Sequence, residues 1–226
     1  MTQPCKTGFR ALICALLLIP ASWVAPAAAA TNVRVVDGDT LVIGGQTFRL
    51  EGIDAPELGQ KCVSANGNTV RCGAASRKYL ERLVSRKTIT CSGDTRDAYD
   101  RVIATCFAAS LNLNSEMVLR GQAFAFRKYS KRYIREETQA RSAKAGLWAG
   151  RAEMPWDFRA RKWEVADQGA PAGCPIKGNI SDRGKIYHPP WSPAYSRTRI
   201  NVAKGERWFC SEREAREAGW RPAAGS

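Results

Sequence analysis

The sequence predicts an α+β fold that is mainly β, with helices against a small closed barrel and a small disulfide-stapled domain at the C-terminal end. Three observations support this prediction. β-Branched segments alternate with turn residues, helical patterns lie between and after them, and two cysteines bracket an aromatic-rich segment near the C-terminus. Hydrophobic residues make up 44% of the 226 residues, which is enough for an ordinary core. A mixed open sheet is the alternative.

Residues 1–30 have the three-part pattern of a secretory signal peptide. A short basic start precedes the apolar run 11–24, and 27–30 supplies small residues for cleavage. The apolar run is shorter than a membrane-spanning helix requires, and an uncleaved anchor is the alternative. We therefore expect a periplasmic or secreted protein that begins near Thr31 and has no stable membrane insertion after cleavage.

The strands are predicted from β-branched composition and turn signals. They are 32–36, 39–43, 46–50, 87–91 and 101–107. The glycine pair 44–45 is a two-residue hairpin signal between the second and third strands. Antiparallel pairing of the last two strands places Cys91 opposite Cys106, within disulfide range.

Helical patterns occupy three segments. The predicted helices are 74–84, 114–120 and 130–145. Leu80, Leu83 and Val84 share one face of the first helix. Asn112 or Asn114 is a candidate cap of the second helix, and Gly146 ends the third.

The composition divides the chain after the third helix. We expect a main domain over 31–163, a linker over 164–173 rich in Ala, Gly, Pro and Gln, and a small module over 174–221. A unit of fewer than 50 residues requires a staple, because its own core is too small to stabilise it.

Six cysteines follow residue 30, and an even number in an oxidising compartment favours disulfides. The absence of C-x-x-C spacing makes zinc binding and thioredoxin-type redox chemistry weaker alternatives. Among the many pairings we prefer the sequential one. It joins Cys62 to Cys72, Cys91 to Cys106 and Cys174 to Cys210.

The charged composition restricts the chemistry. His188 is the only histidine, which excludes multi-His metal sites and argues against Ser-His-Asp or Cys-His catalysis. The formal net charge is +14, and a basic surface attracts polyanions such as nucleic acid. Adhesion or solubility is the alternative reason for a basic exported protein.

Acidic and basic clusters fall at strand ends and turns. They are Asp37-Gly38-Asp39-Thr40, Arg49, Asp54-Ala55-Pro56-Glu57 and Tyr99-Asp100-Arg101. Two carboxylates with a backbone carbonyl suit a hard cation, two arginines clamp a phosphate, and a further carboxylate deprotonates water. This inventory meets the demands of metal-assisted phosphodiester hydrolysis. Taken singly, each cluster is equally typical of a turn, a helix start or a surface ion pair.

The register of the hairpin formed by strands 39–43 and 46–50 affects whether Asp39 and Arg49 can face the same site. A two-residue turn pairs Arg49 with Thr40 and not with Asp39. We therefore expect a bulge or a barrel bend where Asp39 and Arg49 turn toward one site.

The strings 36–40, 48–50 and 53–57 resemble the staphylococcal nuclease family, and 99–101, 121–123 and 137–148 follow in the family's order. The resemblance covers residues 32–163. It implies a five-stranded OB-fold barrel with about three helices, and a calcium-dependent nuclease acting on DNA and also on RNA.

The resemblance also implies roles for individual residues. Asp39, Asp54 and the carbonyl of Ala55 would bind Ca²⁺, Glu57 would be the general base, and Arg49 and Arg101 would bind the phosphate. Asp37 and Thr40 would support the site, and Tyr99 and Tyr129 would contact the nucleotide. The sequence departs from the family at Ala98, where the type member has Lys, and at Arg127, which replaces one tyrosine of a pair.

The segment 174–221 resembles a short Cys-bracketed module found on secreted nuclease-like proteins, which implies no chemistry. We expect a monomeric exported nuclease. The alternatives are a non-catalytic OB-fold module that binds nucleic acid or polysaccharide, and an envelope or exopolysaccharide-associated factor.

Overall fold

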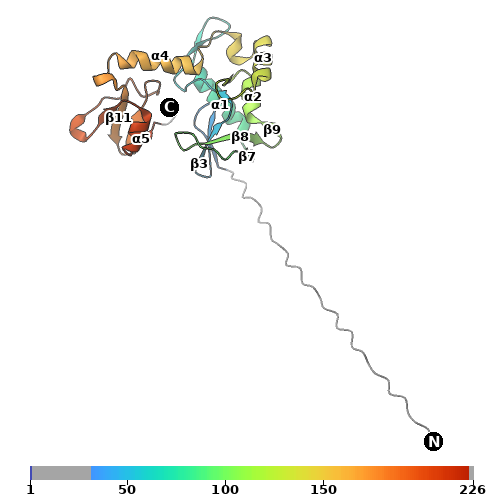
Figure 1. Ribbon diagram of the computed structural model, residues 1–226. Helices are drawn as coiled ribbons and strands as arrows, with labels where there is room; N and C mark the ends of the chain where they lie inside the picture. Colours follow the sequence, from blue (N-terminus) through green and yellow to red (C-terminus); the bar gives the residue numbers. More distant parts are fainter. Residues whose placement is uncertain (2–31, 224–226) are drawn as a thin grey trace.

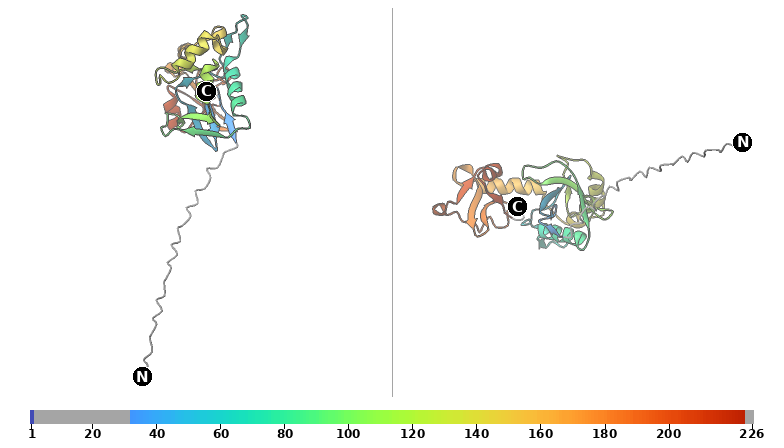
Figure 2. Two further views of the ribbon diagram at one scale, coloured as in Figure 1. Left: turned by 90° about the vertical axis from the view of Figure 1, so that its right-hand side faces the viewer. Right: turned by 90° about the horizontal axis from the view of Figure 1, so that it is seen from below.

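The computed structural model describes residue 1 and residues 32–223 (Figure 1). The predicted signal peptide lies, apart from Met1, outside the described residues. Within the described part of the chain, no helix is both long and apolar enough to cross a membrane. Two lobes lie side by side in Figure 1 and in the right-hand view of Figure 2, and helix α4 (Pro155–Asp167) runs from one to the other.

The larger lobe is organised around a mixed sheet. Its strands are β1 (Val33–Val35), β2 (Thr40–Ile43), β3 (Gln46–Leu50), β8 (Val102–Ala108) and β7 (Ile89–Ser92) in spatial order, and β9 (Leu111–Asn112) pairs with β8. Only the β3–β8 pair is parallel among the pairs of this sheet. Gly44 and Gly45 both have positive φ, 57° and 85°, as a tight hairpin turn requires. The predicted pairing of Arg49 with Thr40 is confirmed.

The hydrogen-bonded pairing does not close this sheet into a barrel. Among the described strands, β1 and β7 form its two edges. Strands β4 (Ile53–Asp54) and β10 (Phe124–Ala125) pair separately with each other, as do β5 (Cys62–Val63) and β6 (Thr69–Val70). The α+β class is confirmed, whereas the closed barrel is not shown.

Three helices belong to the larger lobe, of which the first two pack on the main sheet and the third packs against the second and against β10. They are α1 (Cys72–Val84), α2 (Leu113–Leu119) and α3 (Ile134–Ser142). The Asn112 side chain caps α2 by accepting a hydrogen bond from the backbone N–H of Ser115. Helix α3 is shorter at both ends than predicted, and Lys144 with a φ of 49° stands outside the helical range just beyond it. Leu41, Leu80 and Met117 are fully buried in the shared core.

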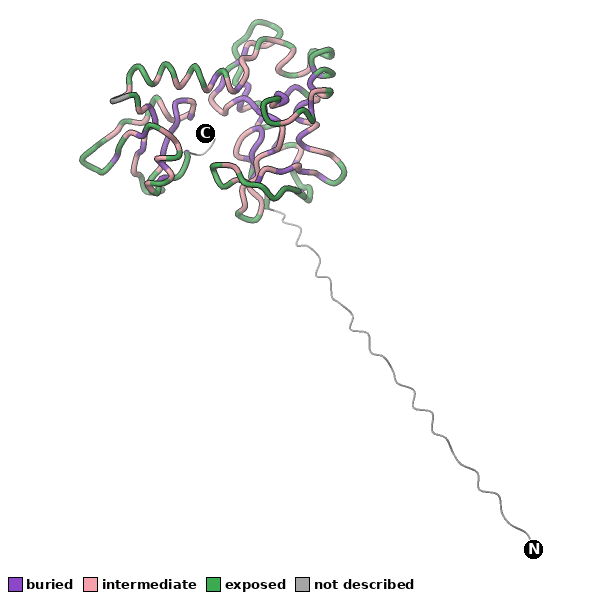
Figure 3. The backbone as a smooth tube through the Cα atoms, in the orientation of Figure 1, coloured by how far each residue is buried: buried purple, intermediate pink, exposed green. Residues whose placement is uncertain are grey.

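The smaller lobe has a core of its own, visible as a second buried region in Figure 3. Its strands are β11 (Ile176–Ser181), β12 (Gly184–His188), β13 (Arg207–Phe209) and β14 (Arg221–Pro222), and its helix is α5 (Glu212–Glu217). Short 3₁₀ turns occupy Gly146–Ala149, Pro171–Gly173 and Val202–Lys204. Helix α4 extends to Asp167, so the predicted linker 164–173 begins inside a helix.

The three predicted disulfides are confirmed. Cys62 is bonded to Cys72, Cys91 to Cys106 and Cys174 to Cys210. The first closes the loop between β5 and α1, the second joins β7 to β8, and the third staples the smaller lobe.

Candidate active site

One half of the site forms at the start of β2. The carboxylate of Asp39 is buried, and its Oδ2 accepts a hydrogen bond from the backbone N–H of Ala55 at 2.6 Å. Its Oδ1 forms an ion pair with Arg49, and the Thr40 hydroxyl donates to the same oxygen at 3.2 Å. Asp37 accepts a hydrogen bond from the backbone N–H of Asp39 at 3.0 Å. These contacts tie the β2–β3 hairpin to the segment after β4.

Arg49 reaches Asp39 without a bulge. The register that pairs Arg49 with Thr40 continues unbroken, because the backbone N–H of Leu50 donates to the carbonyl of Asp39 at 2.8 Å. The expected bulge between these residues is therefore wrong. The length of the arginine side chain brings its guanidinium to Asp39 and, at 3.1 Å, to Asp54.

The other half of the site contains an arginine that sequence reasoning did not select. Asp54 lies in β4 with its side chain 1% exposed, and its Oδ2 accepts a hydrogen bond from Nη2 of Arg159 at 2.8 Å. Nη1 of Arg159 donates to Oε1 of Glu57 at 2.6 Å. Carboxylates and guanidiniums therefore alternate through the site in the order Asp39, Arg49, Asp54, Arg159 and Glu57.

Two glycines allow the backbone of the site to pack against α1. A Cβ atom on Gly38 would lie 2.1 Å from Oγ of Ser76 and 2.6 Å from Cβ of Ala55. A Cβ atom on Gly73 would lie 1.8 Å from the carbonyl oxygen of Glu57. Because real Cβ contacts are longer than this, larger residues at these positions would separate the acidic segments from the helix.

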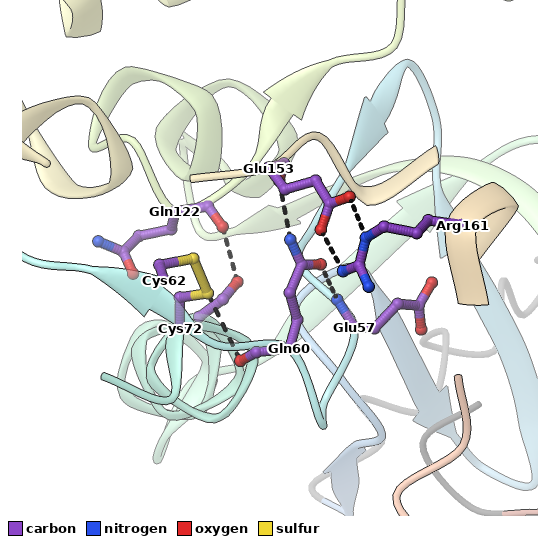
Figure 4. The surroundings of a disulfide bond; sticks show 8 residues. Glu57, Gln60, Cys62, Cys72, Gln122, Glu153 and Arg161 are labelled. Carbon is purple, nitrogen blue, oxygen red and sulfur yellow. Dashed lines mark hydrogen bonds and ion pairs between the residues drawn. A yellow bond between two sulfur atoms is a disulfide. The ribbon is translucent and has the colours of Figure 1, made fainter. Parts of the chain in front are cut away.

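The Glu57 segment is held in place by the buried side chain of Gln60 (Figure 4). Its Oε1 accepts a hydrogen bond from the backbone N–H of Glu57 at 3.1 Å. Its Nε2 donates to the backbone carbonyl of Glu153 at 2.8 Å, just before α4 begins. The Cys62–Cys72 disulfide comes just after Gln60 along the chain. The candidate base and the start of α4 therefore share one anchor.

Burial shifts the pKa values of the acids in this cluster to different extents. It raises the pKa of Glu57 to about 8 despite the opposing charge of Arg159, and it raises the pKa of Asp54. Burial, together with the neighbouring charge of Asp39, raises the pKa of Asp37 to about 7. Burial acts in the same direction on Asp39, but Arg49 and the Ala55 N–H outweigh it and lower the pKa of Asp39.

Arg101 and Tyr99 lie beside this cluster and are held by other partners. Arg101 forms an ion pair with Asp97 at 2.7 Å, and its charge contributes to lowering the pKa of Asp39. The Tyr99 hydroxyl donates a hydrogen bond to Glu212 of α5 at 2.6 Å. The guanidinium carbons of Arg101 and Arg216 lie 4.8 and 4.5 Å from the centre of the Tyr99 ring. The predicted nucleotide contact therefore also touches the smaller lobe, although Tyr99 remains 37% exposed.

Tyr129 lines a groove of about 710 Å³ on the other side of Arg159. Aromatic and cationic side chains alternate around it. The lining includes Phe126, Arg127, Lys128, Tyr129, Arg141, Trp156 and Arg159. The rings of Phe126 and Trp156 are stacked, with centroids 5.4 Å apart and 10° between their planes. Such a groove suits single-stranded nucleic acid, whose bases stack on aromatic rings.

The donor set has the chemistry that calcium prefers, because Asp39, Asp54 and the backbone carbonyl of Ala55 all offer hard oxygen atoms. Among residues 32–223, however, no group of three or more His, Cys, Asp or Glu side chains is arranged to hold a metal ion. The carboxylates are bound instead by the guanidiniums of Arg49 and Arg159. The site therefore offers oxygen atoms of the type that a hard cation binds, and in this structure they are paired with guanidiniums.

Sequence reasoning missed Arg159 because it stands in a run of cations in a segment to which no helix was assigned. Pro155 at the first helical position and Asp157 in the first turn were signals for helix α4. No pattern separates Arg159 from Arg161, which pairs with Glu153 away from the cluster. Only the tertiary fold distinguishes them.

Comparison with known families divides the chain as the two lobes do. Residues 47–150 match the family described as staphylococcal nuclease homologue. Residues 161–222 match the family described as ArfC. The first match contains Arg49, Asp54, Glu57 and Arg101, whereas Arg159 lies between the two matches.

Individual relatives agree with the first match. The chain is 34% identical over 122 residues to the succinoglycan biosynthesis protein ExoI of Rhizobium meliloti, covering 53% of this chain and 64% of that protein. It is 33% identical over 138 residues to an uncharacterized endonuclease of Escherichia coli, covering 58% and 84%. It is 32% identical over 145 residues to the micrococcal nuclease of Shigella flexneri, covering 56% and 78%. The chain therefore belongs to the staphylococcal nuclease homologue family.

Proposed function

We propose that this chain is an exported, calcium-dependent nuclease that hydrolyses phosphodiester bonds of DNA and also of RNA. The observation that carries the proposal is the convergence of three carboxylates on two guanidiniums at one end of the β2–β3 hairpin. Anions and cations in such a cluster match the needs of a phosphodiester and of an attacking water. Membership in the nuclease family and the basic composition support the same reading.

Each residue of the cluster has a proposed role. Glu57 takes the proton of the attacking water, and Arg49 and Arg101 bind the phosphate and stabilise its developing negative charge. Asp39, Asp54 and the carbonyl of Ala55 would hold calcium, which supplies further positive charge to the phosphate oxygens when bound. Asp37 and Thr40 orient Asp39 through the hydrogen bonds described above.

Further parts of the proposal concern the whole protein. The main sheet is proposed to correspond to the five-stranded OB barrel of the family, with Tyr99 and Tyr129 contacting nucleotides. Export is supported by the three disulfides, which persist in oxidising compartments. The protein is proposed to act as a monomer.

The test compares the wild-type protein with Glu57→Gln. Oxidised protein beginning at Thr31 is incubated with single-stranded DNA, duplex DNA or RNA, in calcium or in a chelator. We expect calcium-dependent cleavage by the wild type and a kcat lower by about 10²–10⁴-fold in the variant, because a general base is lost. Binding of a short oligonucleotide should persist in the variant, since Arg49 and Arg101 are unchanged.

Glu153→Gln is the matched control. Glu153 lies near the site but pairs with Arg161, so its variant should cleave at the wild-type rate. Unchanged turnover in Glu57→Gln would remove Glu57 from the mechanism. Intact nucleic acid under every condition would contradict the nuclease assignment and favour a binding module.

A second candidate function rests on the name of one relative, the succinoglycan biosynthesis protein ExoI. It is an exopolysaccharide-associated role with binding to a glycan in place of cleavage. A salt titration separates the two, because binding to nucleic acid weakens steeply with salt and binding to a neutral glycan does not.

A further inference from the structure

Arg159 is held by the two acids that the proposed reaction most needs. Its Nη2 lies 2.8 Å from Oδ2 of Asp54, and its Nη1 lies 3.2 Å from Oδ1 of the same residue. Nη1 also lies 2.6 Å from Oε1 of Glu57. One guanidinium therefore binds a proposed metal ligand with two hydrogen bonds and the proposed base with a third.

The arginine and a divalent cation compete for these oxygens. A calcium ligand lies 2.3–2.6 Å from the ion, and a guanidinium N–H is drawn to the same lone pairs of the carboxylate oxygens. Arg49 and Arg159 already share the carboxylate of Asp54, whose side chain is 1% exposed and poorly screened, so a third positive group there would be repelled strongly. Occupation of Asp54 by one cation therefore opposes occupation by the other.

We infer that Arg159 is a built-in competitor of the divalent cation, binding Asp54 and Glu57 until the cation displaces it. The inference rests on the proposed function for the existence of the cation site. On this inference, Arg159 of α4 sets the affinity of the site for the cation. Helix α4 lies outside the part of the chain that matches the nuclease family. Displacement also frees Glu57 from the guanidinium, so cation binding and release of the proposed base occur together.

The surroundings provide a place for the displaced side chain. Arg159 also lines the groove next to Tyr129, and its side chain is already 25% exposed. The carboxylate of Glu137 lines the same groove, where it is already bound by Arg127 and by the backbone N–H of Ala125. A rotation toward this groove would therefore place the arginine at a solvent-accessible surface, away from Asp54.

The start of α4 does not have to move for this exchange. The backbone carbonyl of Glu153 is bound by Gln60, and Trp156 is stacked on Phe126. Both contacts lie before Arg159 along the chain, so they hold the first turn of α4 while the arginine changes partners. The effect of the cation should therefore appear at Arg159 and in the later turns of the helix.

Calcium binding to the oxidised chain, measured by isothermal titration calorimetry with calcium alone, tests the inference. We expect Arg159→Gln to bind calcium about 10–100-fold more tightly than wild type, the range that a few charge-assisted hydrogen bonds represent. Arg161→Gln, on the same helix but paired with Glu153, should bind as the wild type does. Arg159→Lys should fall between, because it keeps the charge and loses the two-pronged geometry.

The outcomes separate this inference from the proposed function. Equal or weaker calcium binding by both Arg159 variants, with measurable binding by the wild type, overturns the inference and leaves the calcium site standing. Absence of binding in all proteins overturns the inference and the calcium dependence together. If Asp54→Asn loses calcium binding and Arg159→Gln binds calcium more tightly, both the calcium site and the competition by Arg159 are supported.

Hydrogen exchange supplies a readout that does not depend on the substitutions. By reciprocity, a cation that displaces Arg159 must weaken the attachment of α4 to the site. Saturating calcium should therefore speed amide exchange in the last turns of α4 of the wild-type protein, residues 160–167. Slower or unchanged exchange there would contradict displacement, whereas an arginine with a merely structural role predicts no change.

Discussion

At the scale of single residues, the site depends on the missing side chain of Gly38. Asp37 and Asp39 on either side of it are carried toward α1 and the segment after β4. The space that a Cβ atom would need is filled by the Ser76 hydroxyl and the methyl group of Ala55. The Asp-Gly-Asp string therefore serves close packing, in addition to forming a turn.

Gly38→Ala tests this packing. The added methyl group meets atoms at 2.1 and 2.6 Å, so the hairpin must shift away from α1. We expect the free energy of unfolding to fall by about 1–3 kcal/mol, the usual cost of overpacking, and nuclease activity to fall with it. Urea unfolding and a cleavage assay measure both. Gly169→Ala is the control, since the nearest atom to its Cβ would be 4.0 Å away, and equal effects in the two variants would contradict the steric explanation.

At the scale of elements, the second strand pair is held by a covalent link. Cys91 of β7 stands directly opposite Cys106 of β8, and the disulfide closes a loop across a sequence separation of 15. This loop contains Tyr99 and Arg101, so the cross-link also restricts the proposed substrate contacts.

Replacing both cysteines, Cys91→Ala with Cys106→Ala, should reduce the free energy of unfolding by about 3 kcal/mol. The chain-entropy model gives this value for a loop of about 15 residues. Denaturant unfolding of the double variant and the oxidised wild type measures the difference. A loss well below 1 kcal/mol would show that the unfolded chain retains structure around this hairpin.

At the scale of the whole molecule, the smaller lobe is docked beside the site at two places. Glu212 and Arg216 of α5 engage Tyr99, as described above. Gly59, two residues after Glu57, lies so close to the loop of the smaller lobe that its Cβ would be 3.7 Å from atoms of Trp191 and Pro193. The smaller lobe thus borders both the proposed base and a proposed nucleotide contact.

Glu212→Gln should loosen this docking, because a neutral acceptor binds the Tyr99 hydroxyl more weakly than a carboxylate does. We expect limited proteolysis of segment 168–173 to become a few-fold faster. Glu217→Gln is the matched control on the same helix, since Glu217 pairs only with the exposed Arg213 among the contacts described for it. Identical cleavage rates in the two variants would show that this hydrogen bond does not hold the lobes together.

His188 makes the stability of the smaller lobe sensitive to acid. The residue is 8% exposed, with Nε2 of its ring 2.9 Å from Oδ1 of Asn179 and Nδ1 3.3 Å from Oγ of Ser192. Burial, with a smaller contribution from Lys177, lowers the pKa of His188 below its usual 6.5. The unfolded chain therefore takes up a proton first, and stability is lost as the pH falls below about 6.5 toward the lowered value.

Thermal unfolding measured between pH 7.5 and 5 should show this loss for the smaller lobe. His188→Gln removes the titrating group, so its unfolding should depend less on pH across the same range. An equally steep dependence in the variant would assign the acid sensitivity to other groups.

Patterns local in sequence predicted much of this protein. Strand composition and the Gly44-Gly45 turn placed the β2–β3 hairpin and its register, and helical periodicity placed α1 and α2. Cysteine spacing within a presumed oxidising compartment predicted the disulfides. These features succeed because hairpin turns, helix caps and short covalent loops are determined by neighbours along the chain.

The ends of α3 and the helical start of the predicted linker were not predicted, and a mixed open sheet was given only as the alternative to a closed barrel. Each of these features depends on which residues, distant in sequence, pack against the segment in the folded protein. Gly121 and Gly146 approach each other so closely that a Cβ on Gly146 would lie 2.4 Å from the carbonyl oxygen of Gly121, and this contact shapes the chain after α3.

The sequence by itself determined which chemical groups are available for the site: the acids Asp39, Asp54 and Glu57 and the cation Arg49, in an order that is typical of one family. Tertiary structure alone decided that Arg159 joins them and that α5 contacts Tyr99. The physical reason is distance along the chain. Arg159 meets Asp54 across 105 residues and Tyr99 meets Glu212 across 113, and only the packing of two lobes selects one arginine or one glutamate from many similar ones.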